Sequence, residues 1–117
     1  MSKACHLALL IALTSALPAA AADYAPLRCA KAATSTEKAI CASYSLGQAE
    51  ARMATLYQWA TSFVAMGQRG VLQDQQSAFI KKREACRADA TCIRNAYNVR
   101  IEQLEAVMDN VKQHGPF

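Results

Sequence analysis

Four cysteines that follow an apolar N-terminal segment constrain this chain of 117 residues more than any other feature. They are Cys29, Cys41, Cys86 and Cys92. A secreted chain of this length buries little apolar surface when it folds, and cross-links commonly supply the missing stability. Four thiols in an oxidising compartment therefore predict two disulfides on a small scaffold with one domain.

The first 22 residues follow the plan of a secretory signal peptide. Lys3 supplies the positive charge, residues 4–17 are mostly apolar, and Pro18 precedes four alanines. This apolar stretch is shorter than the about 20 residues that a membrane-spanning helix needs. We expect cleavage near Ala22, which places the mature protein in the periplasm or outside the cell, with no membrane anchor. Loss of Lys3 lowers the formal net charge from +4 to +3. An uncleaved N-terminal anchor is the alternative.

The rest of the chain has a helical pattern of apolar residues, and glycine and proline are scarce within it. We expect an all-α fold, a small disulfide-stapled helical bundle or hairpin stack, because short connections favour antiparallel neighbours. It has three main helices and one short N-terminal helix. The expected organisation is a signal peptide at 1–22, an extended lead-in at 23–33, a helical domain at 34–112 and a flexible tail at 113–117. Within the domain we expect helices at 34–42, 45–66 and 71–87, and a last helix after the turn at 87–91.

Helix-capping residues mark several of these boundaries. Thr34 and Glu37 have the spacing of a capping box, in which each side chain accepts a backbone N–H of the other residue. Residues 45–48 repeat that arrangement at the start of the second helix. We expect Gly67 in a left-handed conformation just after the second helix, and Asp89 as the N-cap of the last helix.

Four cysteines allow three disulfide connectivities, and we favour the pairing of neighbours. A Cys29–Cys41 bridge would tie the lead-in to the short first helix. A Cys86–Cys92 bridge would fix the angle between the third and fourth helices. The other two connectivities remain open at this level.

The residues that catalysis and metal binding require are scarce. His6 belongs to the signal peptide and His114 to the tail, so no nucleophile has an imidazole base in a rigid site. The cysteines are separated by eleven and by five residues within each pair, which fits neither a zinc site nor a redox dithiol. Basic residues are dispersed, and residues 81–83 indicate a solvated helix face and not a nucleic-acid surface. We expect that the protein is not an enzyme and that it binds no cofactor, no metal and no nucleic acid.

Three sequence blocks resemble a known family. Residues 29–41 resemble the C-x-K-A-x-T-x-x-E-K-x-I-C opening of the lysozyme-inhibitor LprI-like family, long catalogued as a domain of unknown function in small secreted bacterial proteins. Residues 50–57 are similar to the family's long helix, and the third block runs from Arg83 to Leu104. The chain departs from the family at residues 43–46, Ser-Tyr-Ser-Leu in place of Asp-Pro-Glu-Leu, and at Phe79, where a tryptophan is usual.

The resemblance implies a non-catalytic binding protein that occludes a partner protein, in this family a lysozyme-like muramidase. Arginine and tyrosine dominate interface hot spots, so the candidate contact residues are Arg52, Tyr57, Arg83, Tyr97 and Arg100. Core packing of the two tyrosines and ion pairing of the three arginines within the bundle are the alternatives for these residues. The alternative function is a structural or stress-related module of the cell envelope with no lysozyme target.

Electrostatics give the inhibitor hypothesis no long-range support. Many lysozymes are strongly basic, and a mature chain of net charge +3 is not steered toward a basic partner. A local acidic patch would change this, and the candidates for one are Asp74, Glu102, Glu105 and Asp109.

Overall fold

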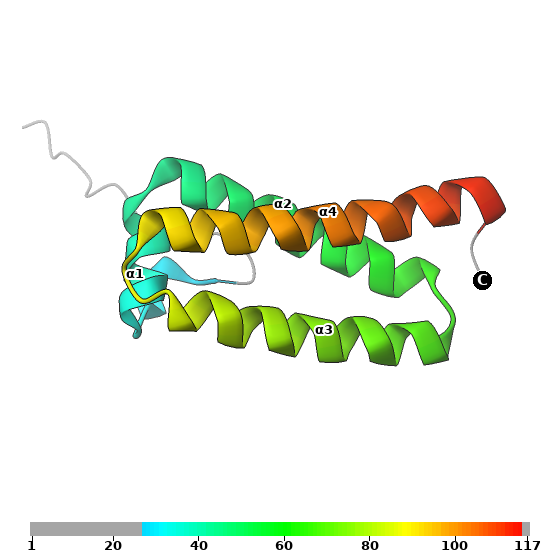
Figure 1. Ribbon diagram of the computed structural model, residues 1–117, viewed down its shortest axis with the longest axis horizontal. Helices are drawn as coiled ribbons and strands as arrows, with labels where there is room; N and C mark the ends of the chain where they lie inside the picture. Colours follow the sequence, from blue (N-terminus) through cyan, green and yellow to red (C-terminus); the bar gives the residue numbers. More distant parts are fainter. Residues whose placement is uncertain (1–26, 116–117) are drawn as a thin grey trace, which may run out of the picture.

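The computed structural model describes residues 27–115, and these form a helical bundle (Figure 1). The expected signal peptide, its cleavage site and the first residues of the lead-in lie outside the described residues. The elements in chain order are the 3-10 turn η1 (Cys29–Lys31), α1 (Ser35–Ala42), α2 (Tyr44–Phe63), α3 (Met66–Ala85) and α4 (Ala90–His114). Three long helices and one short one agree with the expected all-α fold.

The short helix α1 begins where the sequence predicts. The Thr34 hydroxyl accepts the Glu37 backbone N–H at 3.0 Å, and the Glu37 carboxylate accepts the N–H of Thr34 at 3.2 Å. The carboxylate also accepts the N–H of Ala33 at 2.7 Å, so three donors at the helix start are satisfied. A disulfide joins Cys29 to Cys41 with the two Cα atoms 5.6 Å apart, and it ties η1 to the last turn of α1. The described part of the lead-in therefore contains a helical turn and is not wholly extended.

The predicted capping box at residues 45–48 is wrong, because α2 begins earlier. Ser43 is the N-cap, and its hydroxyl accepts the N–H of Leu46 at 3.4 Å. Ser45 already lies in the first turn, where its hydroxyl accepts a hydrogen bond of 2.6 Å from Arg94 of α4. This contact between distant segments gives Ser45 a partner that a local pattern does not reveal.

The turn between α2 and α3 also differs from the prediction, since it consists of Val64 and Ala65. Val64 is buried, and its backbone leaves the helix at this point in an extended conformation. Arg69 reaches back from α3 and donates to the Thr61 carbonyl at 2.8 Å and to the Val64 carbonyl at 3.5 Å. A guanidinium therefore satisfies carbonyl groups at the end of α2 that we expected a C-terminal glycine motif to satisfy. Gly67 instead lies inside the first turn of α3.

A second disulfide closes the turn between α3 and α4. It joins Cys86 to Cys92 with the Cα atoms 5.5 Å apart. Asp89 is the N-cap of α4, as expected, and its carboxylate accepts the Cys92 N–H at 3.0 Å. Arg87 adopts a left-handed conformation with φ of 53°. Because α4 continues to His114, the helical part extends beyond the predicted start of the tail at residue 113.

The three long helices run side by side, with α3 antiparallel to both α2 and α4 (Figure 1). The most extensive contact is between α2 and α4. The small helix α1 lies against the end that carries both disulfides, where the Thr36 hydroxyl donates to the Glu84 carbonyl at 3.3 Å. We call this the disulfide end, and we call the opposite end, at Val64 and Ala65, the turn end. Among residues 27–115, no helix is long and apolar enough to cross a bilayer.

The core lies where the three long helices meet. Its fully enclosed apolar side chains include Ile40 from α1, Leu46 and Met53 from α2, and Ile93 and Leu104 from α4. Several large apolar residues of α2 and α3 remain exposed. They include Phe63, Val71 and Ile80.

Candidate functional site

A buried cluster of polar side chains joins the three long helices. Arg83 of α3 donates to the Glu50 carboxylate of α2 at 3.0 Å and to the Tyr97 hydroxyl of α4 at 3.2 Å. The Tyr97 hydroxyl in turn donates to the same carboxylate. Phe79 covers the cluster, with its ring centroid 5.5 Å from that of Tyr97 and 5.8 Å from the Arg83 guanidinium carbon. Each of the three long helices therefore contributes one polar side chain to a single closed network.

The environment of this network shifts the pKa values of all three groups. Burial raises the pKa of the Glu50 carboxyl, and the hydrogen bond from Tyr97 and the charge of Arg83 oppose that rise. Burial and the Glu50 carboxylate both raise the pKa of Tyr97. Burial by itself would lower the pKa of Arg83, but Tyr97 and Glu50 outweigh it and raise it. The network is therefore strongly coupled, and Arg83 stays charged.

A raised carboxyl pKa can mark a general acid, but the geometry at Glu50 opposes that role. The carboxylate is fully enclosed and accepts hydrogen bonds from Tyr97, Arg83 and the Leu27 backbone. In the described part of the chain Glu50 is 1% exposed, so its carboxylate is closed to a substrate. The network is therefore a structural lock between helices.

A second buried cation lies farther along α4. Arg100 is 1% exposed and donates to the Gln76 side-chain oxygen at 2.9 Å and to the Leu72 carbonyl at 3.2 Å. It also donates to the side-chain oxygens of Gln75 and Gln103, each at 3.3 Å. Neutral oxygens thus surround this guanidinium, and burial lowers the pKa of Arg100.

The structure separates the five candidate contact residues into two groups. Arg83, Tyr97 and Arg100 are buried, and their polar atoms bind one another and neighbouring helices. Tyr57 is half-buried, and its ring centroid lies 6.0 Å from the Arg100 guanidinium carbon. Arg52 is exposed on α2 and forms an ion pair with Glu105 of α4. Of the five, Arg52 alone has an exposed side chain.

Two of the four carboxylates of the suggested acidic patch form ion pairs with cations. Glu105 pairs with Arg52, and Asp109 pairs with Lys112 at 2.9 Å. The Glu84 carboxylate accepts a hydrogen bond of 3.1 Å from Arg83. Within residues 27–115, no group of three His, Cys, Asp or Glu side chains could hold a metal ion.

Exposed apolar side chains gather along one side of α2 toward the turn end. Trp59 is 54% exposed, Phe63 is 42% exposed, and Met66 at the start of α3 is 84% exposed. Residues 52, 56, 59 and 63 are spaced by four, three and four, so their side chains share one face of the helix. We call this face, together with Met66, the α2 surface; its residues are Arg52, Leu56, Trp59, Phe63 and Met66.

The α2 surface was missed by the sequence reasoning, which gave neither Trp59 nor Phe63 a role. The available signal was the spacing of Arg52, Leu56, Trp59 and Phe63, a second apolar stripe beside the core stripe of α2. The pair between Arg52 and Glu105 shows that α4 borders this face. An arginine, a tryptophan and a phenylalanine on one exposed helix face have the composition of an interface hot spot.

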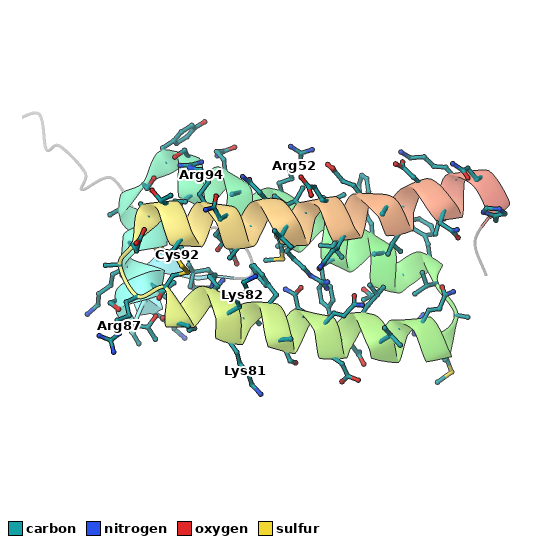
Figure 2. All side chains as sticks on the ribbon, viewed as in Figure 1. Arg52, Lys81, Lys82, Arg87, Cys92 and Arg94 are labelled. Atoms are coloured by element: carbon teal, nitrogen blue, oxygen red, sulfur yellow. A yellow bond between two sulfur atoms is a disulfide. The ribbon has the colours of Figure 1, made fainter. Side chains whose placement is uncertain are left out.

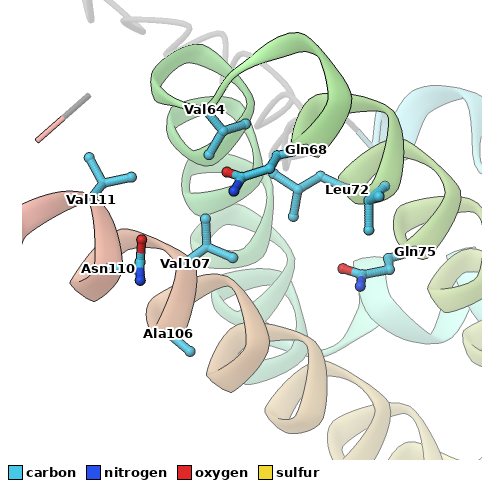
Figure 3. A pocket seen from close by; sticks show the side chains of 9 residues that line it. Val64, Gln68, Leu72, Gln75, Ala106, Val107, Asn110 and Val111 are labelled. Carbon is cyan, nitrogen blue, oxygen red and sulfur yellow. The ribbon is translucent and has the colours of Figure 1, made fainter. Parts of the chain in front are cut away.

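A groove of about 390 Å³ opens between α3 and α4 near the turn end (Figure 3). Val64, Leu72, Val107 and Val111 form its apolar part, and amide side chains such as Gln68 and Asn110 stand at its rim. It contains no charged side chain and no nucleophile. This groove can accommodate an apolar side chain but offers no catalytic group.

The comparison with known families supplies the decisive observation. The model of the family described as lysozyme inhibitor LprI matches residues 29–113. The chain belongs to the lysozyme inhibitor LprI family. The matched LprI segment contains both disulfides, the Glu50–Arg83–Tyr97 network and the α2 surface. No curated protein and no solved structure matches the chain. LprI membership and the two disulfides together indicate an extracytoplasmic protein.

Proposed function

We propose that the protein is a non-catalytic inhibitor, exported to the periplasm or beyond, that binds a lysozyme-like muramidase and occludes its substrate cleft. Membership in the LprI family over residues 29–113 is the observation that carries this proposal. Cleavage of residues 1–22 after export is part of it.

The distribution of polar groups supports binding over catalysis. The carboxyl with a raised pKa, Glu50, is enclosed within the bundle and saturated with hydrogen bonds. The exposed carboxylates Glu105 and Asp109 are held by cations on the surface. A rigid body with an inert interior and an exposed aromatic face is suited to filling a cleft on another protein.

The α2 surface is the contact region that we assign to the muramidase. Trp59 and Phe63 project from the end of a helix that α4 supports along its length. Such a convex ridge complements a concave substrate cleft, and burial of a central tryptophan commonly contributes about 2 kcal/mol or more to binding. The paired charges of Arg52 and Glu105 flank the ridge, and they help to orient the bound partner more than they raise the affinity for it.

A turbidity assay tests inhibition directly. Exported, purified protein is added in increasing amounts to lysozyme and a suspension of bacterial cell walls. We expect the rate of clearing to fall to a plateau as the protein saturates the enzyme. An unchanged rate at large molar excess contradicts the lysozyme target.

The alternative, an envelope module with no lysozyme target, predicts a different set of partners. Immobilised protein is exposed to envelope extract, and bound proteins are identified by mass spectrometry. Recovery of a muramidase, reduced by a Trp59→Ala substitution, supports the inhibitor. Recovery of unrelated envelope proteins, with no effect of that substitution, supports the alternative.

A further inference from the structure

Besides Arg28, six exposed cations surround the disulfide end of the bundle, on η1, α1, α3, α4 and the turn between α3 and α4. Figure 2 shows Lys81 and Lys82 on α3, Arg87 in the turn and Arg94 on α4. Lys31 of η1 and Lys38 of α1 lie on the same end. One disulfide ties η1 to α1 and the other ties the end of α3 to α4, so the six positive charges sit on a cross-linked platform.

The carboxylates of this end do not neutralise the platform. Glu37 accepts backbone N–H groups of α1, Asp89 accepts the Cys92 N–H, and Glu84 pairs with the buried Arg83. Within the described residues, none of the six exposed cations forms an ion pair. The six exposed cations outnumber these three carboxylates by three, and the buried charges of Arg83 and Glu50 cancel.

The other half of the bundle has no such excess of one sign. Its four carboxylates are balanced by four cations, of which two form ion pairs, one donates to backbone carbonyls and the fourth is the buried Arg100. The formal net positive charge is therefore concentrated at the disulfide end, and the α2 surface lies on the half that carries no net charge. An anionic surface would attract the disulfide end and leave the α2 surface free.

We infer that the disulfide end is a docking surface for the anionic headgroups of a phospholipid membrane. The cations are distributed around the end of the bundle on five segments, and of these Lys82 lies beside a hollow between α3 and α4, so they suit an extended negative surface more than a single strand of nucleic acid. Tyr44 at the start of α2 is 76% exposed, next to Ser45, which binds Arg94. A tyrosine beside cations is typical of residues that sit at headgroup level. Docking in this orientation concerns a different surface from the proposed inhibition.

Co-sedimentation with vesicles tests this docking. The exported protein is used after mass measurement has established the loss of residues 1–22, since an intact leader would itself bind lipid. Each cation near an anionic surface strengthens binding roughly fivefold, so three of them contribute roughly a hundredfold. We expect about that ratio between vesicles containing about one third phosphatidylglycerol and vesicles of phosphatidylcholine alone. In about 1 M salt, where the Debye length is about 3 Å, the preference is lost.

Two double variants with equal net charge locate the contact. Lys81→Gln with Lys82→Gln removes two charges from the disulfide end and should weaken binding roughly 25-fold. Arg52→Gln with Lys112→Gln removes two charges from the other half and should change binding less than about twofold. The inference would be overturned by equal losses of vesicle binding in both variants or by equal binding to anionic and neutral vesicles. Tighter binding to single-stranded RNA than to anionic vesicles would also overturn it. Retained inhibition of lysozyme by the Lys81→Gln/Lys82→Gln variant shows that the two surfaces act separately.

Discussion

Replacement of Arg83 by methionine tests the buried network most sharply. The substitution keeps a long, flexible side chain but removes the cation that faces the Glu50 carboxylate. Breaking a buried ion pair from one side costs about 3–5 kcal/mol, because the remaining charge is left without its partner. The second ion pair of Arg83, to the partly exposed Glu84, adds about 0–1 kcal/mol. We therefore expect the free energy of unfolding at pH 7 to fall by about 4 kcal/mol.

The stability that Arg83→Met loses should depend on pH, and the direction of that dependence can be worked out. Burial already raises the pKa of Glu50, and removal of Arg83 takes away a charge that holds it down. A carboxyl whose folded-state pKa is raised binds its proton in the folded state first, so stability rises as pH falls through that pKa toward the unfolded value near 4.5. The difference between wild type and Arg83→Met should therefore shrink on acidification from pH 8 to about 5.

Urea unfolding followed by circular dichroism measures these differences, with the exposed pair between Arg52 and Glu105 as the matched control. Glu105→Gln should cost less than about 1 kcal/mol at every pH, since exposed ion pairs contribute little. Adding Glu50→Gln to Arg83→Met should restore at least about 2 kcal/mol, because it removes the stranded carboxylate. A cost for Arg83→Met no larger than that of Glu105→Gln, or one independent of pH, refutes the proposed role of the network.

Three further expectations concern the ends of the helices. Replacing both cysteines of the Cys29–Cys41 bridge by alanine should cost about 3 kcal/mol in urea unfolding, and the same change at Cys86–Cys92 about 2 kcal/mol, because the second loop is shorter; the reverse order contradicts the loop-closure reasoning. Arg87→Val should lower the midpoint of thermal unfolding while Arg87→Gly leaves it nearly unchanged, since φ of 53° excludes β-branched side chains; equal midpoints would argue against the left-handed turn. Backbone hydrogen bonds lower the pKa of Glu37, so its stabilising effect is present above pH about 4.5 and is lost as pH falls through the lowered folded value; a difference between wild type and Glu37→Gln that does not shrink in acid contradicts this.

The sequence predicted those parts of the fold that depend on neighbours in the chain. The Thr34–Glu37 capping box and the Asp89 N-cap form as expected because each involves residues within one helical turn. The predicted start of α3 was wrong because the deciding contact, from Arg69 to the Thr61 carbonyl, joins two different helices. No local pattern identifies an arginine that terminates the preceding helix.

The larger failure of the sequence-based prediction concerned which charged residues are buried. Glu50 lies between Leu46 and Met53 on the apolar stripe of α2, and Arg100 occupies the same kind of position on α4. A charge within such a stripe signals a buried network, but its partners depend on how three helices meet. The exposure of Trp59 likewise depends on which side of α2 remains uncovered, which periodicity alone does not determine.

The most direct test of the account compares two exposed aromatic residues at opposite ends of α2. Lysozyme inhibition is titrated with wild type, Trp59→Ala and Tyr44→Ala, after circular dichroism has shown that all three are folded. The account predicts that Trp59→Ala raises the inhibition constant about 30-fold or more, the equivalent of about 2 kcal/mol, while Tyr44→Ala changes it less than about twofold. Equal inhibition by all three proteins, or a larger loss in Tyr44→Ala, would contradict the claim that the α2 surface occludes the enzyme.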